Sequence, residues 1–401
     1  LGMGQVCSAP RPKGGTYVEN PKPRPTGVPE ALHGPFRLSD FYTFREKLGT
    51  VRTGELWVAE RNSNPGMYEC TSLKLHNQQT IDMTAAGPCS IKQIYAGKSD
   101  TEKKTQFRGF LNEVRILSSL QQHTHIVQMF ESWSDPDHHY IIQERMGEET
   151  LDVSLSINPS GLQESDAAVV FAVVANTLAQ IHDQGVAHRD VRPENFVVSL
   201  EDSGNPRIIL SDFSRALLVG EELYERVDHR VSVFTAPELV RVGKVLYTAT
   251  GHSSDFRSAQ HLFACDCWAL GVLLYQLLHG HRALPFPGEI SVFSPHQELA
   301  SALLRWDPDG IPFPPLPARR ANSSEHAPPR PVSAAAQDLV RCLLRKDYDA
   351  RLTAAQALRH PWVAHNLQRL GSEGSIAVSG SPVSARVLQA ALRSVTRDLL
   401  D

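Results

Sequence analysis

The stretch that decides the fold is His188-Arg-Asp-Val-Arg-Pro-Glu-Asn195, which is followed by Asp212-Phe-Ser214 and Ala236-Pro-Glu238. The Asp and the Asn of the first segment, Asp190 and Asn195, can place a proton-accepting carboxylate and a metal-binding amide on one loop. The Asp of the second segment can hold the same metal ion against phosphate oxygens. The three segments in this order predict a metal-assisted site for phosphate chemistry.

Composition excludes several classes of protein. Of the 401 residues, 41% are hydrophobic and 21% charged, which is typical of a globular chain. The formal net charge of −4 predicts no nucleic-acid partner. The 6 cysteines form no CxxC pair, so we expect no zinc ribbon and a reducing, cytoplasmic compartment. No apolar run reaches the roughly 18 residues of a transmembrane helix, and the longest runs are interpreted as core helices.

Hydrophobic periodicity divides the chain into four parts. Residues 1–35 are rich in Pro and Gly and predict a flexible arm. Residues 36–147 combine short strand patterns with one helical pattern, and residues 148–364 are mainly helical. Residues 365–401 contain a Gly/Ser linker and an amphipathic helix. The predicted strands are 44–48, 55–59, 89–95, 126–133 and 139–143, and the predicted helices are 105–120, 165–184, 266–279, 334–344 and 385–400.

Three further segments interrupt this pattern. Residues 62–88 and 242–262 are interpreted as insertions, the first with a strand-like piece at 68–75. Residues 312–331 are Pro-rich. Within them Pro314-Pro-Leu-Pro-Ala-Arg319 matches a ligand for an SH3 domain, although a stiffened loop between helices explains the same residues.

Together the motifs resemble those of eukaryotic protein kinases over roughly residues 40–364. The resemblance implies an α+β, bilobal fold with an antiparallel-sheet N-lobe and a mainly helical C-lobe. It also implies ATP and Mg as cofactors and a protein substrate. It assigns Asp190 as the catalytic base and Arg192 as the cation of the catalytic loop, with Asn195 and Asp212 as the magnesium ligands.

The segment Leu48-Gly-Thr-Val-Arg-Thr-Gly54 resembles the glycine-rich loop that covers the ATP phosphates. Gly49, Val51 and Gly54 occupy the three glycine positions of that pattern. Because Val51 carries a side chain where the family has glycine, it opposes close approach of the backbone to phosphate.

Two lysines compete for the position that pairs with the α- and β-phosphates. Lys92 stands 21 residues before Glu113, which leaves room for a turn and a helix that carries the glutamate. Lys74 stands 39 residues before it. The spacing favours Lys92 with Glu113 as its partner and keeps Lys74 as the alternative.

The hinge between the lobes follows from Tyr140-Ile-Ile-Gln-Glu-Arg-Met146. By resemblance Gln143 is the gatekeeper, and backbone groups of Glu144 to Met146 bind adenine. The next residues, Gly147-Glu-Glu149, resemble the segment whose acidic residue meets ribose or a basic substrate residue.

Other matches imply structural roles and a subfamily. Asp266 is expected to order the backbone of the catalytic loop, and Arg351 to pair with Glu238. The run of motifs resembles the calmodulin-dependent group and the neighbouring calcium-dependent protein kinases. Those calcium-dependent kinases carry EF-hands, but this sequence contains no EF-hand loop, so we expect no direct calcium binding.

Four residues depart from the family pattern: Val51, Arg192, Ser214 and Val231. Arg192 replaces a lysine, Ser214 a glycine, and Val231 a threonine whose hydroxyl bonds the catalytic Asp. The expected function is a serine/threonine protein kinase that transfers the γ-phosphoryl of Mg-ATP to a protein hydroxyl. The alternative is a pseudokinase that acts as an ATP-binding or allosteric scaffold.

Both ends of the sequence suggest interactions. Met3-Gly-Gln-Val-Cys-Ser8 matches the N-myristoylation pattern, with Gly4 as acceptor and Cys7 as a palmitoylation candidate, if Met3 is the native start. We then expect a cytoplasmic protein with peripheral membrane attachment. The helix at 385–400 is expected either to block the substrate groove until a partner protein releases it or to pack on the C-lobe for stability.

Overall fold

The computed structural model describes most of the chain. The described residues are 38–51, 53–62, 72–74, 80–82, 88–121, 123–147, 149–200, 206–219, 231–242, 259–286, 290–291, 293–305, 307–313, 331–372 and 391. The predicted N-terminal arm, including Gly4 and Cys7, and the SH3-ligand segment lie outside them. Of the helix expected at 385–400, only Ala391 is described, and it is helical and buried in the main hydrophobic core.

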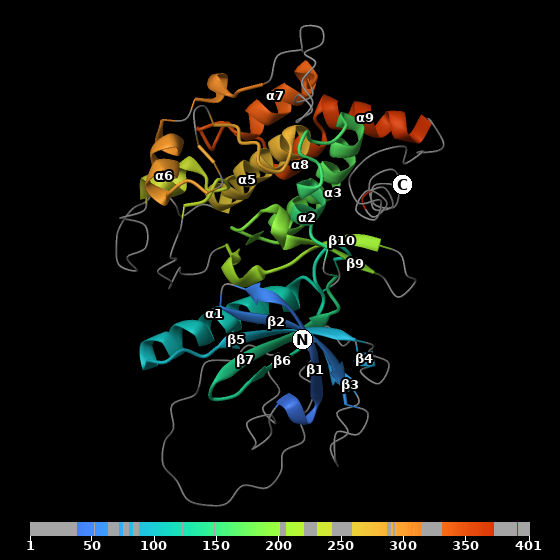
Figure 1. The fold of residues 1–401 in the computed structure, drawn as a ribbon, viewed down its shortest axis with the longest axis vertical. Coiled ribbons are helices and arrows are strands. Elements are labelled where there is room, and N and C mark those ends of the chain that lie inside the picture. The colour runs from blue at the N-terminus through green and yellow to red at the C-terminus, as the bar shows by residue number, and fades with distance from the viewer. Residues whose placement is uncertain are drawn as a thin grey trace, which may run out of the picture.

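An antiparallel sheet of five strands, ordered β1-β2-β5-β7-β6, forms one end of the molecule (Figure 1). Its strands are β1 (Tyr42–Val51), β2 (Gly54–Arg61), β5 (Cys89–Tyr95), β6 (Met129–Ser134) and β7 (His138–Glu144). All five strand predictions are confirmed. β1, β2 and β7 extend past their predicted bounds because pairing with a neighbour continues past the apolar run, whereas β6 begins at Met129 rather than at 126. The first insertion contributes a separate hairpin of β3 (Ser72–Lys74) and β4 (Thr80–Asp82).

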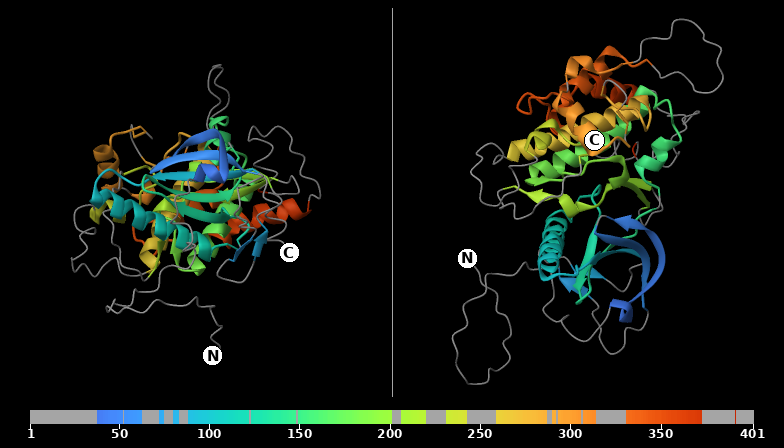
Figure 2. Two further views of the ribbon diagram at one scale, coloured as in Figure 1. Left: turned by 90° about the horizontal axis from the view of Figure 1, so that it is seen from below. Right: turned by 60° about the vertical axis from the view of Figure 1, so that its left-hand side comes forward.

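The helix α1 (Asp100–Ser119) packs on one face of this sheet (Figure 2). It begins five residues before the predicted start because a capping box precedes the apolar pattern. The Ser99 hydroxyl accepts from the Glu102 amide at 3.2 Å, and the Glu102 carboxylate accepts from the Ser99 amide at 3.1 Å. Phe110, Val114 and Leu117 bury the inner face, and Glu113 is buried among them.

The helical part is built around two long apolar helices, α3 (Glu164–Asp183) and α5 (Ala259–His279). The helix α5 begins seven residues before the predicted 266, so residues 259–262 are helical rather than part of the polar insertion. Both helices are long and apolar enough to cross a membrane, but 67% and 89% of their most apolar windows are buried inside the protein. They therefore form the core here, as the sequence predicts.

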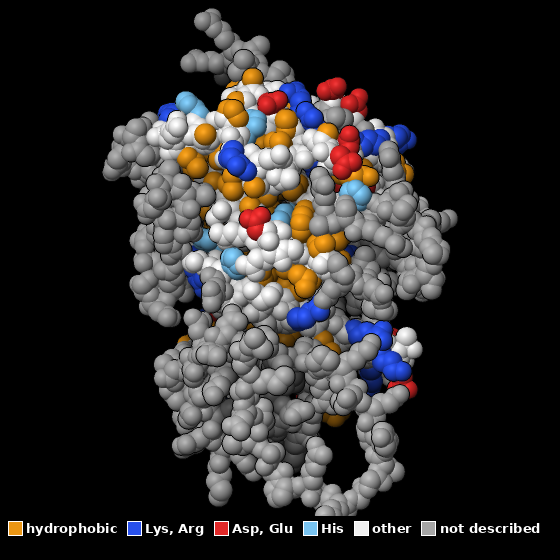
Figure 3. Space-filling view, turned by 180° about the vertical axis from the view of Figure 1, so that it is seen from behind, with side chains coloured by type: hydrophobic (Ala, Val, Ile, Leu, Met, Phe, Trp, Pro, Cys, Tyr) orange, Lys and Arg blue, Asp and Glu red, His pale blue; other side chains and the backbone are white. Residues whose placement is uncertain are grey.

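Shorter helices surround this pair. They are α2 (Leu151–Ser156), α4 (Pro237–Val242), α6 (His296–Leu304), α7 (Ala334–Leu343), α8 (Ala354–Leu358) and α9 (Pro361–Ser372). A main hydrophobic cluster runs from α1 through α3 and α5 to α9, and a smaller cluster lies within the sheet. From behind, hydrophobic side chains are scattered among acidic and basic ones on the helical part (Figure 3).

Short strands between α3 and α4 were not predicted from the sequence. The strand β8 (Val186–Ala187) pairs with β11 (Leu217–Leu218), and β9 (Phe196–Leu200) pairs with β10 (Pro206–Leu210). These pairs flank the segments 188–195 and 211–216. They bring the two segments to the junction between the sheet and the helices (Figure 1).

A buried ion pair between Arg351 and Glu238 connects segments of the helical part. The guanidinium of Arg351 contacts both carboxylate oxygens of Glu238, at 2.6 and 3.0 Å, and its Nη1 also donates to the Ala264 carbonyl at 2.6 Å. Their side chains are 0% and 5% exposed. The pairing matches the contact that the sequence motifs imply. It ties α4 to α5 and to the turn before α8.

We expect Arg351→Met to lower the free energy of unfolding by about 3–5 kcal/mol, because it leaves the Glu238 carboxylate buried without its cation. Urea denaturation measures the change. The matched control is Arg45→Met, which removes an exposed pair with Glu60 and is expected to cost at most about 1 kcal/mol. Equal losses in the two variants would contradict a structural role for the buried pair.

Candidate active site

The sheet and the helical part enclose a cleft of about 600 Å³. This volume lies within the range of small-molecule sites. Residues from both parts line it, including Leu48, Val51, Lys92, Gln143, Met146, Asp190, Arg192, Glu194, Asn195, Asp212, Arg215, Val231, Ser294 and His296. The structure thus brings together residues from the predicted glycine-rich loop, hinge, catalytic loop and metal-binding segment.

Lys92 joins the two parts at the bottom of the cleft. Its Nζ lies 2.6 Å from Glu113 Oε1 on α1 and 2.7 Å from Asp212 Oδ1. The Lys92 and Glu113 side chains are each 4% exposed. The structure therefore pairs Lys92 with Glu113, as the spacing favours, whereas Lys74 lies in the separate β3–β4 hairpin.

Burial and charge oppose each other in this cluster. Burial disfavours the charged form of Lys92, but the carboxylates of Asp212 and Glu113 outweigh it and raise the pKa of the ammonium. For Asp212, burial is outweighed by Lys92, and the pKa of the carboxyl falls well below its usual range. Burial dominates at Glu113 and raises its pKa. The cluster therefore keeps Lys92 protonated and Asp212 ionised, which suits phosphate and metal binding.

The buried carboxylate of Asp266 holds the loop 188–195 by hydrogen bonds to its backbone. Its two oxygens accept from the backbone amides of His188 at 2.8 Å and Arg189 at 2.7 Å, and His182 Nε2 lies 3.0 Å away. Arg189 has a φ of 64°, in the left-handed region that costs energy for a residue with a side chain. Asp266 thus stabilises a strained turn immediately before Asp190, the anchoring role that the sequence motif implies.

Asn195 and Asp212 leave oxygens for a metal ion. The Asn195 amide nitrogen donates to the Asp190 carbonyl at 2.7 Å, which leaves Asn195 Oδ1 as a ligand. Lys92 and the Ser214 amide both use Asp212 Oδ1, which leaves Oδ2. Magnesium takes one or two protein oxygens together with phosphate and water. The donor set therefore fits Mg-ATP, although the described residues contain no cluster of three or more His, Cys, Asp or Glu.

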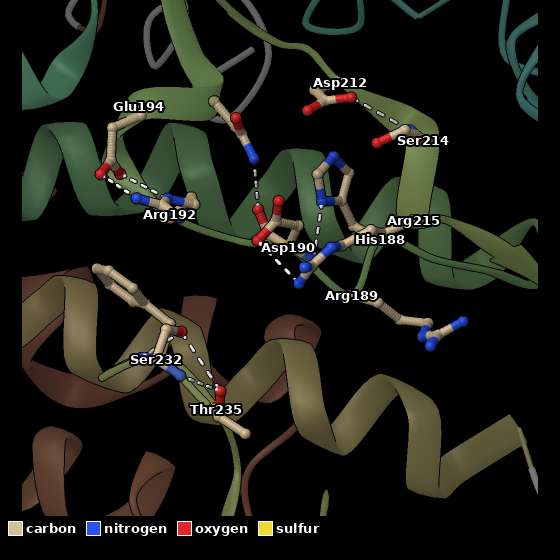
Figure 4. A network of polar contacts seen from close by, with 12 residues as sticks. His188, Arg189, Asp190, Arg192, Glu194, Asp212, Ser214, Arg215, Ser232 and Thr235 are labelled. Atoms are coloured by element: carbon tan, nitrogen blue, oxygen red, sulfur yellow. Dashed lines mark hydrogen bonds and ion pairs between the residues drawn. The ribbon is translucent and has the colours of Figure 1, made fainter. Parts of the chain in front are cut away.

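The two arginines near Asp190 have different partners. Arg192 turns to Glu194, with Nε donating at 2.9 Å and Nη2 forming a second contact (Figure 4). Arg215, one residue after the Asp-Phe-Ser segment, reaches Asp190 instead, with Nη1 3.8 Å from Oδ1. Arg215 therefore forms an ion pair with Asp190 that the sequence motifs did not predict. The hydrogen bond to Glu194 and the charges of Glu194 and Asp190 together raise the pKa of Arg192, so both guanidiniums act on Asp190.

The predicted glycine-rich loop is a tight hairpin. Gly49 and Val51 lie in β1, and Val51 pairs with Gly54 at the start of β2. A Cβ at Gly54 would lie 1.7 Å from the Gln93 carbonyl oxygen, whereas one at Gly49 would have nothing within 4 Å. Packing therefore requires glycine at Gly54 but not at Gly49. Val51 lines the cleft where the family pattern has its middle glycine.

The predicted hinge follows β7. The Glu144 carboxylate accepts from the Gln128 amide at 2.8 Å and also contacts Arg207 of β10, so its side chain ties the hinge to the helical part. The Gln143 side chain is buried and lines the cleft. The Met146 amide donates to the Ser90 hydroxyl at 2.9 Å.

The remaining departures lie around the cleft. Ser214 lies in a short 3-10 helix, residues 213–215, and its amide bonds Asp212 at 3.4 Å. The Val231 carbonyl lies 2.7 Å from His296 Nδ1, which comes from α6. The sequence offered no signal for His296, because 65 residues separate it from Val231. A signal for Arg215 existed, since it follows the Asp-Phe-Ser segment directly.

This geometry agrees with a comparison against known families. The model of the protein kinase domain matches residues 78–363. The chain belongs to the protein kinase family. The match confirms the predicted bilobal α+β kinase fold, and it begins after Lys74.

Several curated serine/threonine kinases are similar to this kinase domain. Calcium/calmodulin-dependent serine/threonine-protein kinase 1 of Oryza sativa subsp. japonica is 35% identical over 254 residues, 63% of this chain and 35% of that protein. CDPK-related kinase 7 of Arabidopsis thaliana is 32% identical over 259 residues, 64% of this chain and 38% of that protein. Ribosomal protein S6 kinase alpha-1 of Rattus norvegicus is 28% identical over 359 residues, 87% of this chain and 40% of that protein.

These matches confirm the predicted resemblance to the calmodulin- and calcium-dependent groups. The chain spans well under half the length of these relatives. Protein kinases typically use ATP and Mg, and the oxygens left at Asn195 and Asp212 fit that pair. The roles of the individual cleft residues, and the domain boundaries at 35, 147 and 364, stay predictions.

We expect Lys92→Met to lower the free energy of unfolding of this kinase domain by about 3 kcal/mol, because Glu113 would remain buried, and Asp212 partly buried, without their cation. The loss should be smaller at pH 5 than at pH 8. Without Lys92 the pKa values of the two carboxyls rise above those of the unfolded chain, so the folded state gains stability as protons bind.

Lys74→Met is the matched control and is expected to change stability little. Urea denaturation at the two pH values measures both variants. A larger loss from Lys74→Met, or a Lys92→Met loss that does not depend on pH, would contradict the assigned cluster.

Proposed function

We propose that this domain is a serine/threonine protein kinase that transfers the γ-phosphoryl group of Mg-ATP to a protein hydroxyl. The observation that carries the proposal is the Lys92 bridge from Glu113 to Asp212, in a cleft that also contains Asp190 and Asn195. A protein kinase needs the lysine–glutamate ion pair and an aspartate that can hold magnesium. Lys92–Glu113 is the first of these, and Asp212 would supply the second.

The residues of the cleft divide the chemical work. Bound Mg-ATP supplies the phosphoryl group and the metal charge. Lys92 would hold phosphate oxygens, and Asn195 and Asp212 would hold the metal ion. Asp190 accepts the proton of the substrate hydroxyl as general base. Asp266 holds the Asp190 loop through two backbone amides, so the base stays oriented without substrate.

Arg215 would take the electrostatic role that the kinase resemblance implies for Arg192. The Arg192 guanidinium is committed to Glu194 through two contacts. Arg215 forms an ion pair with the Asp190 carboxylate. From there its guanidinium would stabilise the negative charge that develops on the phosphoryl oxygens during transfer. The 3.8 Å ion pair with Asp190 is loose, so the Arg215 guanidinium could leave it and bind phosphoryl oxygens, which a guanidinium can hold through two nitrogens.

One set of observations favours the alternative function, a scaffold that binds ATP without efficient catalysis. Asp190 and Arg192 already have internal partners, and Val51 lines the cleft in place of a glycine. Each internal contact must be exchanged for a substrate contact before transfer. The retained Asp190, Asn195 and Asp212 support the enzyme, because together they would supply a base and two metal ligands in one cleft.

We expect the domain to phosphorylate serine or threonine in a generic basic peptide with Mg-ATP, and Asp190→Asn to lower kcat at least about 100-fold. Transfer of ³²P to the peptide measures the rate. Retained Mg-dependent thermal stabilisation of Asp190→Asn by ATP is the control for folding and binding.

Two results would contradict the enzyme. Binding of Mg-ATP without transfer would support the scaffold. Transfer that survives Asp190→Asn would show that a contaminant or another group is responsible.

Arg215→Ala is expected to lower kcat roughly tenfold or more, with a smaller change in the KM for ATP, because the guanidinium acts on charge that develops during transfer. Arg192→Ala is the matched comparison, and it should lower kcat less. Steady-state kinetics on the same peptide measures both. A larger effect at Arg192 would return the role to that residue and sink our assignment.

A further inference from the structure

The backbone amide of Met146 already has a partner inside the protein. It donates to the Ser90 hydroxyl at 2.9 Å, and both residues are buried, Ser90 completely and Met146 to 7% exposure. Met146 lines the cleft at the hinge. Backbone groups of this segment are the ones that the kinase resemblance assigns to adenine. The hydroxyl therefore occupies a donor that a base would need.

The register of the sheet places Ser90 there. Ser90 lies in β5 directly opposite Gln143 of β7, two residues before Lys92. Strand β7 ends at Glu144, and two residues later the Met146 amide reaches the Ser90 hydroxyl. The hinge has little freedom to move away, because a Cβ at Gly147 would lie 2.2 Å from the Val198 carbonyl oxygen. The strand pairing and the close packing of the hinge thus hold the Ser90 hydroxyl and the Met146 amide next to each other.

We propose that Ser90 competes with the nucleotide base for the Met146 amide and thereby sets the affinity of the cleft for adenine. The proposal rests on the proposed function in so far as it takes the base to bind at this hinge. Adenine presents an unprotonated ring nitrogen as the acceptor for a backbone amide. To accept from Met146, adenine must displace the Ser90 hydroxyl.

Displacement has a cost because Ser90 is fully buried. The Ser90 hydroxyl oxygen must turn away from the Met146 amide and find another donor or remain unsatisfied, and a buried unsatisfied polar group is unfavourable. Alanine at position 90 would remove the competing acceptor and leave the amide free for the base. The base should then bind more tightly, although the unliganded protein loses one hydrogen bond.

Ser132, in strand β6 of the same sheet, provides a matched control. Ser132 of β6 is also buried, at 1% exposure, and pairs in register with Ile141 of β7. Its hydroxyl has no hydrogen-bond partner among the described residues. Ser132→Ala therefore makes the same chemical change in the sheet without touching the hinge amide.

The experiment measures the Kd of adenosine by calorimetry for the wild type, Ser90→Ala and Ser132→Ala. Adenosine has no phosphates, so contacts to Lys92 and to metal do not contribute. We expect Ser90→Ala to bind adenosine about fivefold more tightly, the equivalent of one hydrogen bond of about 1 kcal/mol. Ser132→Ala should stay within about twofold of the wild type.

Guanosine tests the direction of the hydrogen bond. Its corresponding ring nitrogen carries a proton and cannot accept from the Met146 amide. The gain from Ser90→Ala should therefore be confined to adenosine. An equal gain for guanosine would overturn the proposal, because it would show that the smaller side chain only makes room.

A second measurement needs no ligand. Amide hydrogen exchange at Met146 should be faster in Ser90→Ala than in the wild type and unchanged in Ser132→Ala. Unchanged exchange at Met146 would show that Ser90 does not hold the amide and would overturn the proposal. Thermal unfolding of each variant confirms that it is folded at the temperature used.

The outcomes separate this proposal from the proposed function. Equal adenosine affinity in the wild type and Ser90→Ala, including no binding in either, overturns the competition. If transfer to peptide still occurs, the kinase function survives that result. Conversely, tighter adenosine binding in Ser90→Ala without transfer in either protein supports the competition while the kinase function fails.

Discussion

The ammonium of Lys92, held between Glu113 and Asp212, is the interaction on which the rest of the structure depends. Lys92 and Glu113 are each 4% exposed and Asp212 is 19% exposed, and charges removed from water to this extent need close partners of opposite sign. The sheet must place Lys92 at the cleft, α1 must dock with Glu113 inward, and the segment after β10 must present Asp212. A displacement of any one of these elements would leave a charged side chain without its partner.

Buried polar anchors extend the same principle into the helical part. Asp266 fixes the backbone of the loop that carries Asp190, and Glu238 fixes Arg351 behind it. Both anchors attach to the apolar helix α5, whose packing is rigid. The loops of the cleft are short and irregular, and these contacts hold them in place against the packed core.

The cleft itself is rich in polar groups that already have partners. Arg192 is paired with Glu194, Arg215 with Asp190, and the Met146 amide with Ser90. Binding in such a site is an exchange of partners, so its free energy is a difference between two sets of contacts. The affinity of the cleft for a ligand therefore depends on these internal contacts as well as on the new ones.

The sequence alone determined the family and the order of sheet and helices, because these follow from motif order and hydrophobic period. Chain spacing favoured Lys92 over Lys74 as the partner of Glu113, and the sheet register decided between them. The start of α1 was missed because a capping box is polar and precedes the apolar repeat. Only the tertiary structure decided that Arg215 rather than Arg192 meets Asp190, and that Ser90 meets the hinge. Such contacts depend on strand register and on how loops from distant segments dock, and no local period in a sequence records either.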